Sequence, residues 1–188
     1  IVHWKCPPDT FKTISKLDEA CRSLKQIAKS GKKILFVATK KQAKSIVAES
    51  AKSLNMPYIT ERWPGGLLTN FSTIRKSIKK MNSIDTMKED GTFDTLSKRE
   101  KLQIERTREK LELNFGSIEN MNRIPEAIFV VDINKEHIAV AEANKLGMRS
   151  YAMVDTNTNP KLVNFPIPAN DDSTCLLYTS DAADDFVR

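Results

Sequence analysis

Residues 62–71 combine side chains and a turn that suit contact with phosphates and nucleic-acid bases. Arg62 offers a guanidinium that can bind a phosphate through two parallel hydrogen bonds, and Trp63 offers a ring on which a base can stack. The Pro-Gly-Gly sequence predicts a tight turn in which Gly65 and Gly66 expose backbone N–H groups as a nest for an anion. The segment therefore predicts an RNA site, although a tight loop around a buried tryptophan fits the same residues equally well.

The chain after this turn adds positive charge at helical spacing. Thr69 and Asn70 are residue types that cap a helix, and we expect them to start the helix that follows. The first turns of that helix carry the bases Arg75, Lys76, Lys79 and Lys80. An arginine, an aromatic ring and glycines beside a basic helix favour an irregular RNA surface over a small-molecule cleft.

Positive charge is concentrated in one part of the sequence. The chain has 188 residues and a net charge of +6, but residues 29–81 alone hold twelve lysines and arginines against two glutamates. Residues 165–188, with five aspartates and one arginine, are acidic. The bases lie at turns as well as along helices, including the turn Lys40, Lys41 and Gln42, and this distribution predicts a polyphosphate partner. A solvated helix face is the plainer alternative, and a scaffold that binds only protein would leave the charge unexplained.

A second function class, an α/β enzyme that binds a nucleotide or another phosphate ligand, could use the same strand-end turns. It would rely on Lys40, Arg62, Asp132 and His137. The glycine pattern argues against it, because the sequence holds neither a G-x-G-x-x-G motif nor a P-loop. Aspartates that close buried strands, such as Asp132 and Asp155, are more typical of caps and turns than of catalysis.

Other catalytic and metal chemistry finds little support in the sequence. The three cysteines are widely spaced, and the two histidines, His3 and His137, are far apart, so neither a disulfide framework nor a metal cluster is indicated. We therefore expect no catalysis and no cofactor or metal. No apolar run approaches the ~20 residues of a membrane span, so we expect a reduced, cytoplasmic protein without a membrane contact.

Alternating strand and helix patterns must position these residues. Continuous apolar runs predict strands buried on both faces at 34–38, 127–132 and 151–155, with shorter strands at 58–59 and, as an edge strand that tolerates proline, at 165–168. Apolar residues at helical spacing predict helices at about 10–28, 42–54 and 137–147. The alternation indicates an α/β protein with a parallel sheet flanked by helices.

Residues 71–122 interrupt this alternation, because they contain no strand pattern. Two polar helices are predicted there. The first carries apolar positions from Phe71 to Ile84, and the second opens with a capping box of Ser97 and Glu100. We expect an antiparallel helical hairpin that projects from the sheet.

Further motifs occur in a fixed order along the chain. They occupy residues 34–43, 61–71, 90–93, 129–132, 135–139, 154–157 and 167–172. In this order and spacing they resemble the bacterial small-subunit ribosomal protein S-two family, and the Arg-Trp-x-Gly-Gly-x-Leu-Thr-Asn-Phe block is highly specific to it.

The resemblance implies a Rossmann-like, flavodoxin-like parallel sheet with a protruding helical hairpin, and no catalysis. It implies contact with small-subunit ribosomal RNA near the junction of the subunit's head and body. It also implies contact with neighbouring small-subunit ribosomal proteins, including the large S-one protein that captures messenger RNA. On this basis we assign RNA contact to the turn at 40–42, to the segment 62–70 and to the hairpin.

Both ends of the chain depart from the family pattern. Residues 1–8 match neither the family's opening motif nor its first strand, so we expect them to add no strand and to leave one edge of the sheet bare. From about Cys175 onward the chain looks like a translated sequencing adapter, which indicates a metagenomic gene fragment whose residues 173–188 are a non-native, poorly packed tail. The α/β domain is then expected over 9–172, with the hairpin inserted at about 71–122.

Overall fold

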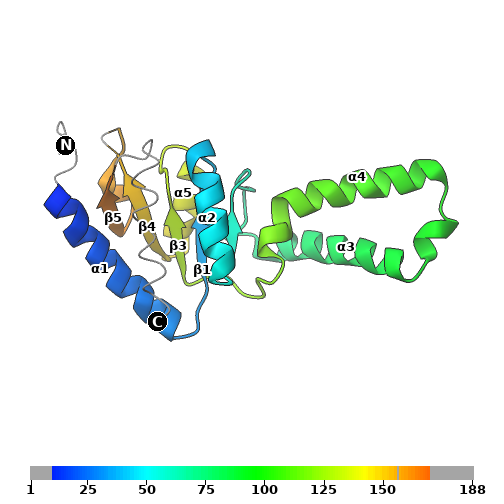
Figure 1. Cartoon of the computed structure of the whole chain (residues 1–188), viewed down its shortest axis with the longest axis horizontal. Helices are drawn as coiled ribbons and strands as arrows, with labels where there is room; N and C mark the ends of the chain where they lie inside the picture. The colour runs from blue at the N-terminus through cyan, green and yellow to red at the C-terminus, as the bar shows by residue number, and fades with distance from the viewer. Residues whose placement is uncertain (1–9, 156, 170–188) are drawn as a thin grey trace.

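The computed structural model describes residues 10–155 and 157–169, which form a parallel sheet with helices on both faces (Figure 1). The strands pair in the order β2-β1-β3-β4-β5, all parallel. Their bounds are β1 (Ile34–Val37), β2 (Tyr58–Ile59), β3 (Ala127–Val130), β4 (Arg149–Val154) and β5 (Phe165–Pro168). This is the flavodoxin-like strand order, so the expected α/β fold is confirmed.

The inner strands β1 and β3 are apolar throughout because both faces of the sheet are covered. In β1, Leu35 and Val37 belong to one core cluster, whereas Ile34 and Phe36 belong to another on the opposite face. The alternation of side chains along a strand places successive residues on opposite faces. A strand that is covered on both sides therefore needs an unbroken apolar run rather than an alternating one.

Helices α1 (Thr10–Lys29) and α2 (Lys41–Ser53) cover the face that carries Ile34 and Phe36. Ala20 and Ile27 of α1 pack in the same cluster as Ile34. Ala43 of α2 packs in a second cluster with Ala38 and Val131, the residues that directly follow β1 and β3. The other face is covered by α5 (His137–Lys145), by the segment 63–68 and by the base of the hairpin.

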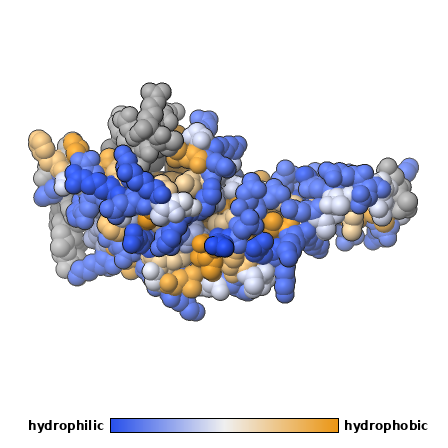
Figure 2. Space-filling model, turned by 90° about the horizontal axis from the view of Figure 1, so that it is seen from below, coloured by the Kyte–Doolittle hydropathy of each residue, from blue (hydrophilic) through white to orange (hydrophobic). Residues whose placement is uncertain are grey.

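The insertion forms the predicted helical hairpin, which projects from the sheet (Figure 1). Its helices are α3 (Phe71–Glu89) and α4 (Lys98–Phe115), with short 3-10 turns η1 (Thr92–Thr95) at the tip and η2 (Gly116–Ile118) at the return. A third such turn, η3 (Pro160–Leu162), precedes β5. The buried side chains of α3 form a narrow stripe: Ile74, Ile78, Met81 and Ile84. Figure 2 shows a mostly hydrophilic arm, with hydrophobic side chains gathered where it joins the sheet.

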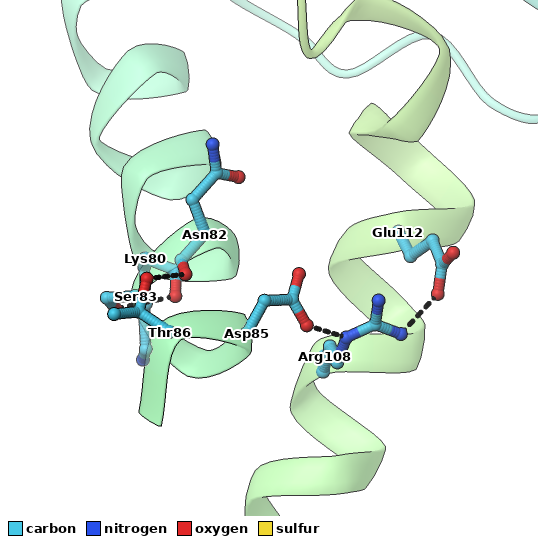
Figure 3. Close-up of polar contacts among 7 residues, drawn as sticks. All are labelled: Lys80, Asn82, Ser83, Asp85, Thr86, Arg108 and Glu112. Carbon is cyan, nitrogen blue, oxygen red and sulfur yellow. Dashed lines mark hydrogen bonds and ion pairs between the residues drawn. The ribbon is translucent and has the colours of Figure 1, made fainter. Parts of the chain in front are cut away.

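Polar contacts supplement this narrow apolar stripe along the hairpin. The guanidinium of Arg108 on α4 donates to the carboxylate of Asp85 on α3 and, at 2.6 Å, to Glu112 one turn further along α4 (Figure 3). The predicted capping box is also present, since the backbone N–H of Glu100 donates to the Ser97 hydroxyl and the Glu100 carboxylate accepts from the Ser97 N–H.

Replacing the cap residue should weaken the hairpin measurably. Ser97→Ala removes the side-chain acceptor for the first turn of α4, and we expect the free energy of unfolding to fall by about 1 kcal/mol. Urea denaturation measures this change. Ser45→Ala, at an exposed position inside α2, is the matched control, because it removes a hydroxyl without removing a cap. Equal effects of the two substitutions would contradict a capping role.

Among the residues that the structure describes, no helix combines the length and the apolar character that a membrane span requires. The expectations for residues 1–8 and 173–188 concern positions outside the described residues.

Candidate nucleic-acid interface

The segment 62–70 is organised around a carboxylate from a distant helix. Trp63 is buried, with 6% of its surface exposed, and Glu142 of α5 is buried beside it at 8%. The Trp63 indole N–H and the Gly66 N–H donate to Glu142 Oε1 at 3.1 and 2.7 Å. The N–H groups of Leu68 and Thr69 donate to Oε2 at 3.0 and 3.1 Å, and the Thr69 hydroxyl donates to the same atom at 3.2 Å.

These contacts keep Glu142 ionised inside the protein. Burial by itself raises the pKa of the Glu142 carboxyl, but the hydrogen bonds from Trp63 and from the backbone of the segment outweigh burial, so the pKa lies below its ordinary value. The segment is thus wrapped around an internal anion.

Two sequence predictions for this segment are corrected by that geometry. The Trp63 ring cannot serve as a stacking plane for a base, because it is buried and its N–H is bound to Glu142. The Gly66 N–H belongs to an anion nest as predicted, but the anion is the protein's own carboxylate. Gly66 has a φ of 85°, which favours glycine there, while Gly65 stays exposed.

Asn70 occupies the N-cap position of α3 as expected, but its role differs from the prediction. Its side chain makes no capping bond to a backbone N–H. Instead, Asn70 Oδ1 accepts hydrogen bonds from the hydroxyls of Ser72 and Thr73, the latter at 2.9 Å. Thr69 does not cap the helix either, because its hydroxyl donates a hydrogen bond to Glu142 Oε2.

Glu142 was missed as a functional residue, although one signal for it exists. It lies beside Ala139 and Ala143 on the buried side of α5, where an apolar side chain is expected. An acidic residue on the apolar face of a helix requires buried donors. Its donors come from a segment more than seventy positions away, so the sequence indicates the need for partners without identifying them.

One residue of the turn at 40–42 is largely buried by contacts within the protein. Lys40 has only 13% of its side chain exposed, and its Nζ lies 3.8 Å from Asp132 Oδ2. Asp132 Oδ1 accepts from the backbone N–H of Asn134 and Lys135, so Asp132 is a turn former as predicted. Lys40 is therefore not a freely exposed cation, whereas its neighbours Lys41 and Gln42 are exposed.

A second buried carboxylate lies near the carboxyl ends of the same strands, β1 and β3. The Thr39 hydroxyl donates to Glu136, which is 3% exposed. Burial is the main cause that raises the pKa of Glu136, and the nearby Asp132 raises it further, while Thr39 and Lys135 act in the opposite direction. His137 is exposed at the start of α5, with Nδ1 3.1 Å from the Asn134 carbonyl oxygen. Of the four residues of the enzyme alternative, Lys40 pairs with Asp132, while Arg62 and His137 are exposed.

Glu136 should make stability depend on pH in a defined direction. Because the pKa of Glu136 is raised in the folded state, ionising this carboxyl group costs more free energy there than in the unfolded state. Ionisation of Glu136 therefore destabilises the fold as pH rises above about 4.5. Glu136→Gln keeps an oxygen for Thr39 and cannot ionise. We expect its stability advantage over the parent to grow from pH 4 to pH 7 in urea titrations. An advantage that is constant or shrinks over this range would contradict the assignment.

Arg62 is exposed at the same edge of the sheet as the start of α2. Its neighbour Glu61 accepts a hydrogen bond from Lys44 Nζ at 2.9 Å, which ties residues 61–62 to the first turns of α2. Arg62 and Lys41 thus lie on neighbouring segments that leave the carboxyl ends of β2 and β1.

The bases at the start of α3 divide into two kinds. Lys76, Lys79 and Lys80 are exposed and form no ion pair within the described part of the chain. Arg75 is different, because its guanidinium donates to the Asn122 carbonyl oxygen at 2.8 Å and so joins α3 to the segment that returns from the hairpin. Arg75 thus has a structural contact that the three lysines lack, and RNA contact by Arg75 stays a prediction.

The profile of a family described as "Ribosomal protein S2" matches residues 9–179, which is most of the chain. The chain belongs to the ribosomal protein S2 family. The resemblance noted from the motifs is thereby confirmed.

Named S2 relatives share extensive identity with the chain. The small ribosomal subunit protein uS2 of Flavobacterium johnsoniae is 65% identical over 164 residues, covering 87% of this chain and 65% of the relative. The uS2 of Porphyromonas gingivalis is 65% identical over 88% of this chain and 59% of its own length, and that of Bacteroides thetaiotaomicron is 62% identical over 88% and 60%. The chain thus spans less than two thirds of the length of these relatives.

In this S2 chain, the exposed members of the predicted site fall into two groups. One group lies where the chain leaves the carboxyl ends of the strands, and the other lies on the first turns of α3 in the hairpin. We call the exposed bases of both groups the cationic surface: Lys41, Arg62, Lys76, Lys79 and Lys80.

Proposed function

We propose that the chain is a structural constituent of the small ribosomal subunit that binds small-subunit ribosomal RNA and performs no catalysis. The observation that carries the proposal is the cationic surface, whose members are exposed and have no ion-pair partner among the described residues. Membership of the S2 family and the printed names of the relatives support the same partner.

Exposed cations bind RNA mainly through its phosphates. Each phosphate contact releases counterions, so affinity falls as salt concentration rises. Lysines act as point charges, while Arg62 can bind one phosphate through two donors. Because the buried Trp63 offers no ring face, affinity in this proposal comes from phosphate neutralisation and shape rather than from base stacking on that residue.

A salt titration tests the proposal directly. Filter binding of the full chain to small-subunit ribosomal RNA should give a slope of log affinity against log salt of about −4, as expected if five phosphates are neutralised. Binding to a mononucleotide, measured in parallel, should be undetectable. A slope near zero, or saturable mononucleotide binding, would favour the α/β enzyme alternative instead.

The proposal extends to partners and location. A small-subunit protein of this family would contact neighbouring ribosomal proteins and lie on the cytoplasmic ribosome. A contact with the large S-one protein, which the motif resemblance implies, is part of this proposal. Co-sedimentation of the tagged chain with assembled small subunits tests it.

No observation favours the enzyme alternative. The sheet edge where α/β proteins bind nucleotides is occupied here by the chain's own contacts, Thr39 with Glu136 and Lys40 with Asp132. Among the described residues, no group of histidines, cysteines and carboxylates has the arrangement of a metal site.

A further inference from the structure

We propose that Glu142 is a positioning residue for RNA binding, which holds the hairpin at a fixed orientation to the sheet. This inference rests on the proposed function, because its consequence is that both parts of the cationic surface meet one RNA together. Glu142 itself is buried and would touch no RNA.

The geometry at the base of the hairpin supports this role. Glu142 belongs to α5, which packs on the sheet, and its Oε2 accepts from Thr69, two residues before α3 begins. Arg75 of α3 donates to the Asn122 carbonyl oxygen and so joins the two limbs, and the Ser117 hydroxyl on the returning limb donates to the Tyr58 carbonyl oxygen of β2. The entering limb is thus tied to α5 by Glu142, while the returning limb is tied to β2.

A carboxylate is required at this position because all of its partners are donors. Two N–H groups converge on Oε1, and two N–H groups and a hydroxyl converge on Oε2. A glutamine in the same place turns its NH₂ group toward one of these two sets and leaves those donors facing another donor. The segment 63–69 must then shift, and the start of α3 shifts with it.

The orientation matters because the cationic surface is divided. Lys41 and Arg62 belong to the sheet, and the three lysines of α3 belong to the arm. Two groups on a rigid frame bind one ligand with an affinity advantage that is lost when the geometry no longer permits both contacts at once. Loosening the junction should therefore weaken RNA binding without removing any cation.

The first arm of the test measures the junction without RNA. Spin labels are placed at Glu49→Cys on α2 and Glu109→Cys on α4, in the full chain with its three native cysteines replaced by alanine. We expect a narrow distance distribution for the parent and a clearly broadened one for Glu142→Gln. Glu119→Gln, an exposed glutamate substitution outside the segment, is the matched control. A role limited to overall stability would leave the width unchanged under folding conditions, and that result would overturn the proposal.

The second arm measures binding of small-subunit ribosomal RNA by the same proteins. Glu142→Gln should lower affinity about tenfold or more and make the salt dependence shallower, because fewer phosphates are met at once. A broadened junction with unchanged affinity would refute the positioning role. A parent that binds no RNA would refute the proposed function, whereas the distance distributions would still report whether Glu142 holds the hairpin.

A milder variant keeps the test decisive if Glu142→Gln does not fold. Thr69→Val removes one donor to Glu142 and leaves the carboxylate and the four other hydrogen bonds in place. We expect a smaller change in the same direction, with affinity reduced about threefold and the distance distribution modestly broadened. No change in either measurement would contradict the inference.

Discussion

Replacing Arg62 and Lys79 together by glutamate is expected to lower the affinity of the chain for small-subunit ribosomal RNA about a hundredfold at moderate salt. Arg62 lies at the sheet edge and Lys79 on the hairpin, and both are exposed without an ion-pair partner among the described residues. Each reversal removes a phosphate contact and adds a repulsive charge. The slope of log affinity against log salt should become shallower by about 2, because two phosphate contacts are lost.

The control for this prediction carries the same change in net charge elsewhere. Lys145→Glu with Lys161→Glu alters two exposed lysines, at the end of α5 and in η3, outside the cationic surface. We expect this pair to reduce affinity only severalfold through long-range repulsion. Equal losses in the two double variants would show that net charge alone governs binding. Thermal unfolding of both variants should match the parent, since all four positions are on the surface.

The second large effect is expected from Glu142→Gln on stability. The substitution leaves buried donors without an acceptor, and we expect the free energy of unfolding to fall by about 2–4 kcal/mol. Urea titration monitored by the fluorescence of Trp63 measures this change, in a Trp4→Phe background so that one tryptophan reports. Glu119→Gln, at an exposed position, should change stability by less than about 0.5 kcal/mol. Similar losses in the two variants would contradict the assigned role.

The difference in stability between the parent and Glu142→Gln should depend on pH. The pKa of Glu142 is lowered in the folded state, so its contribution is fully present above its ordinary value of 4.5 and is lost as pH falls through the folded pKa. We therefore expect the stability gap between parent and Glu142→Gln to be largest near pH 6 and to shrink toward pH 3. A gap that widens on acidification would show that the sign is wrong. The opposite trend is expected for Glu136, whose pKa is raised by burial.

Much of the fold could be predicted because its signals are local. The runs at 34–38 and 127–132 indicated doubly buried strands, and they contain β1 and β3. The capping box of Ser97 and Glu100 marked the start of α4 to the residue. Proline in the segment 165–168 indicated an edge strand, and β5 ends the described sheet.

The candidate site was predicted less completely, because exposure is not a local property. Five of the predicted bases are exposed, but Lys40 is turned toward Asp132 and Arg75 toward Asn122. Both partners are distant in sequence, so residue type and spacing alone do not distinguish a base that contacts another part of the protein from one that is exposed to solvent. The same holds for Trp63, whose two interpretations fitted the sequence equally until its burial was known.

The amino-acid sequence by itself determined the order of strands and helices, the insertion of a hairpin and the family of the chain, since periodicity, caps and motifs act over a few residues. The tertiary structure alone decided which charges face solvent and which anion fills the turn after Trp63. That decision depends on contacts such as Glu142 with residues 63–69, which chain folding brings together on one face of the sheet. Desolvation then obliges every buried donor and carboxylate to find its partner inside the protein.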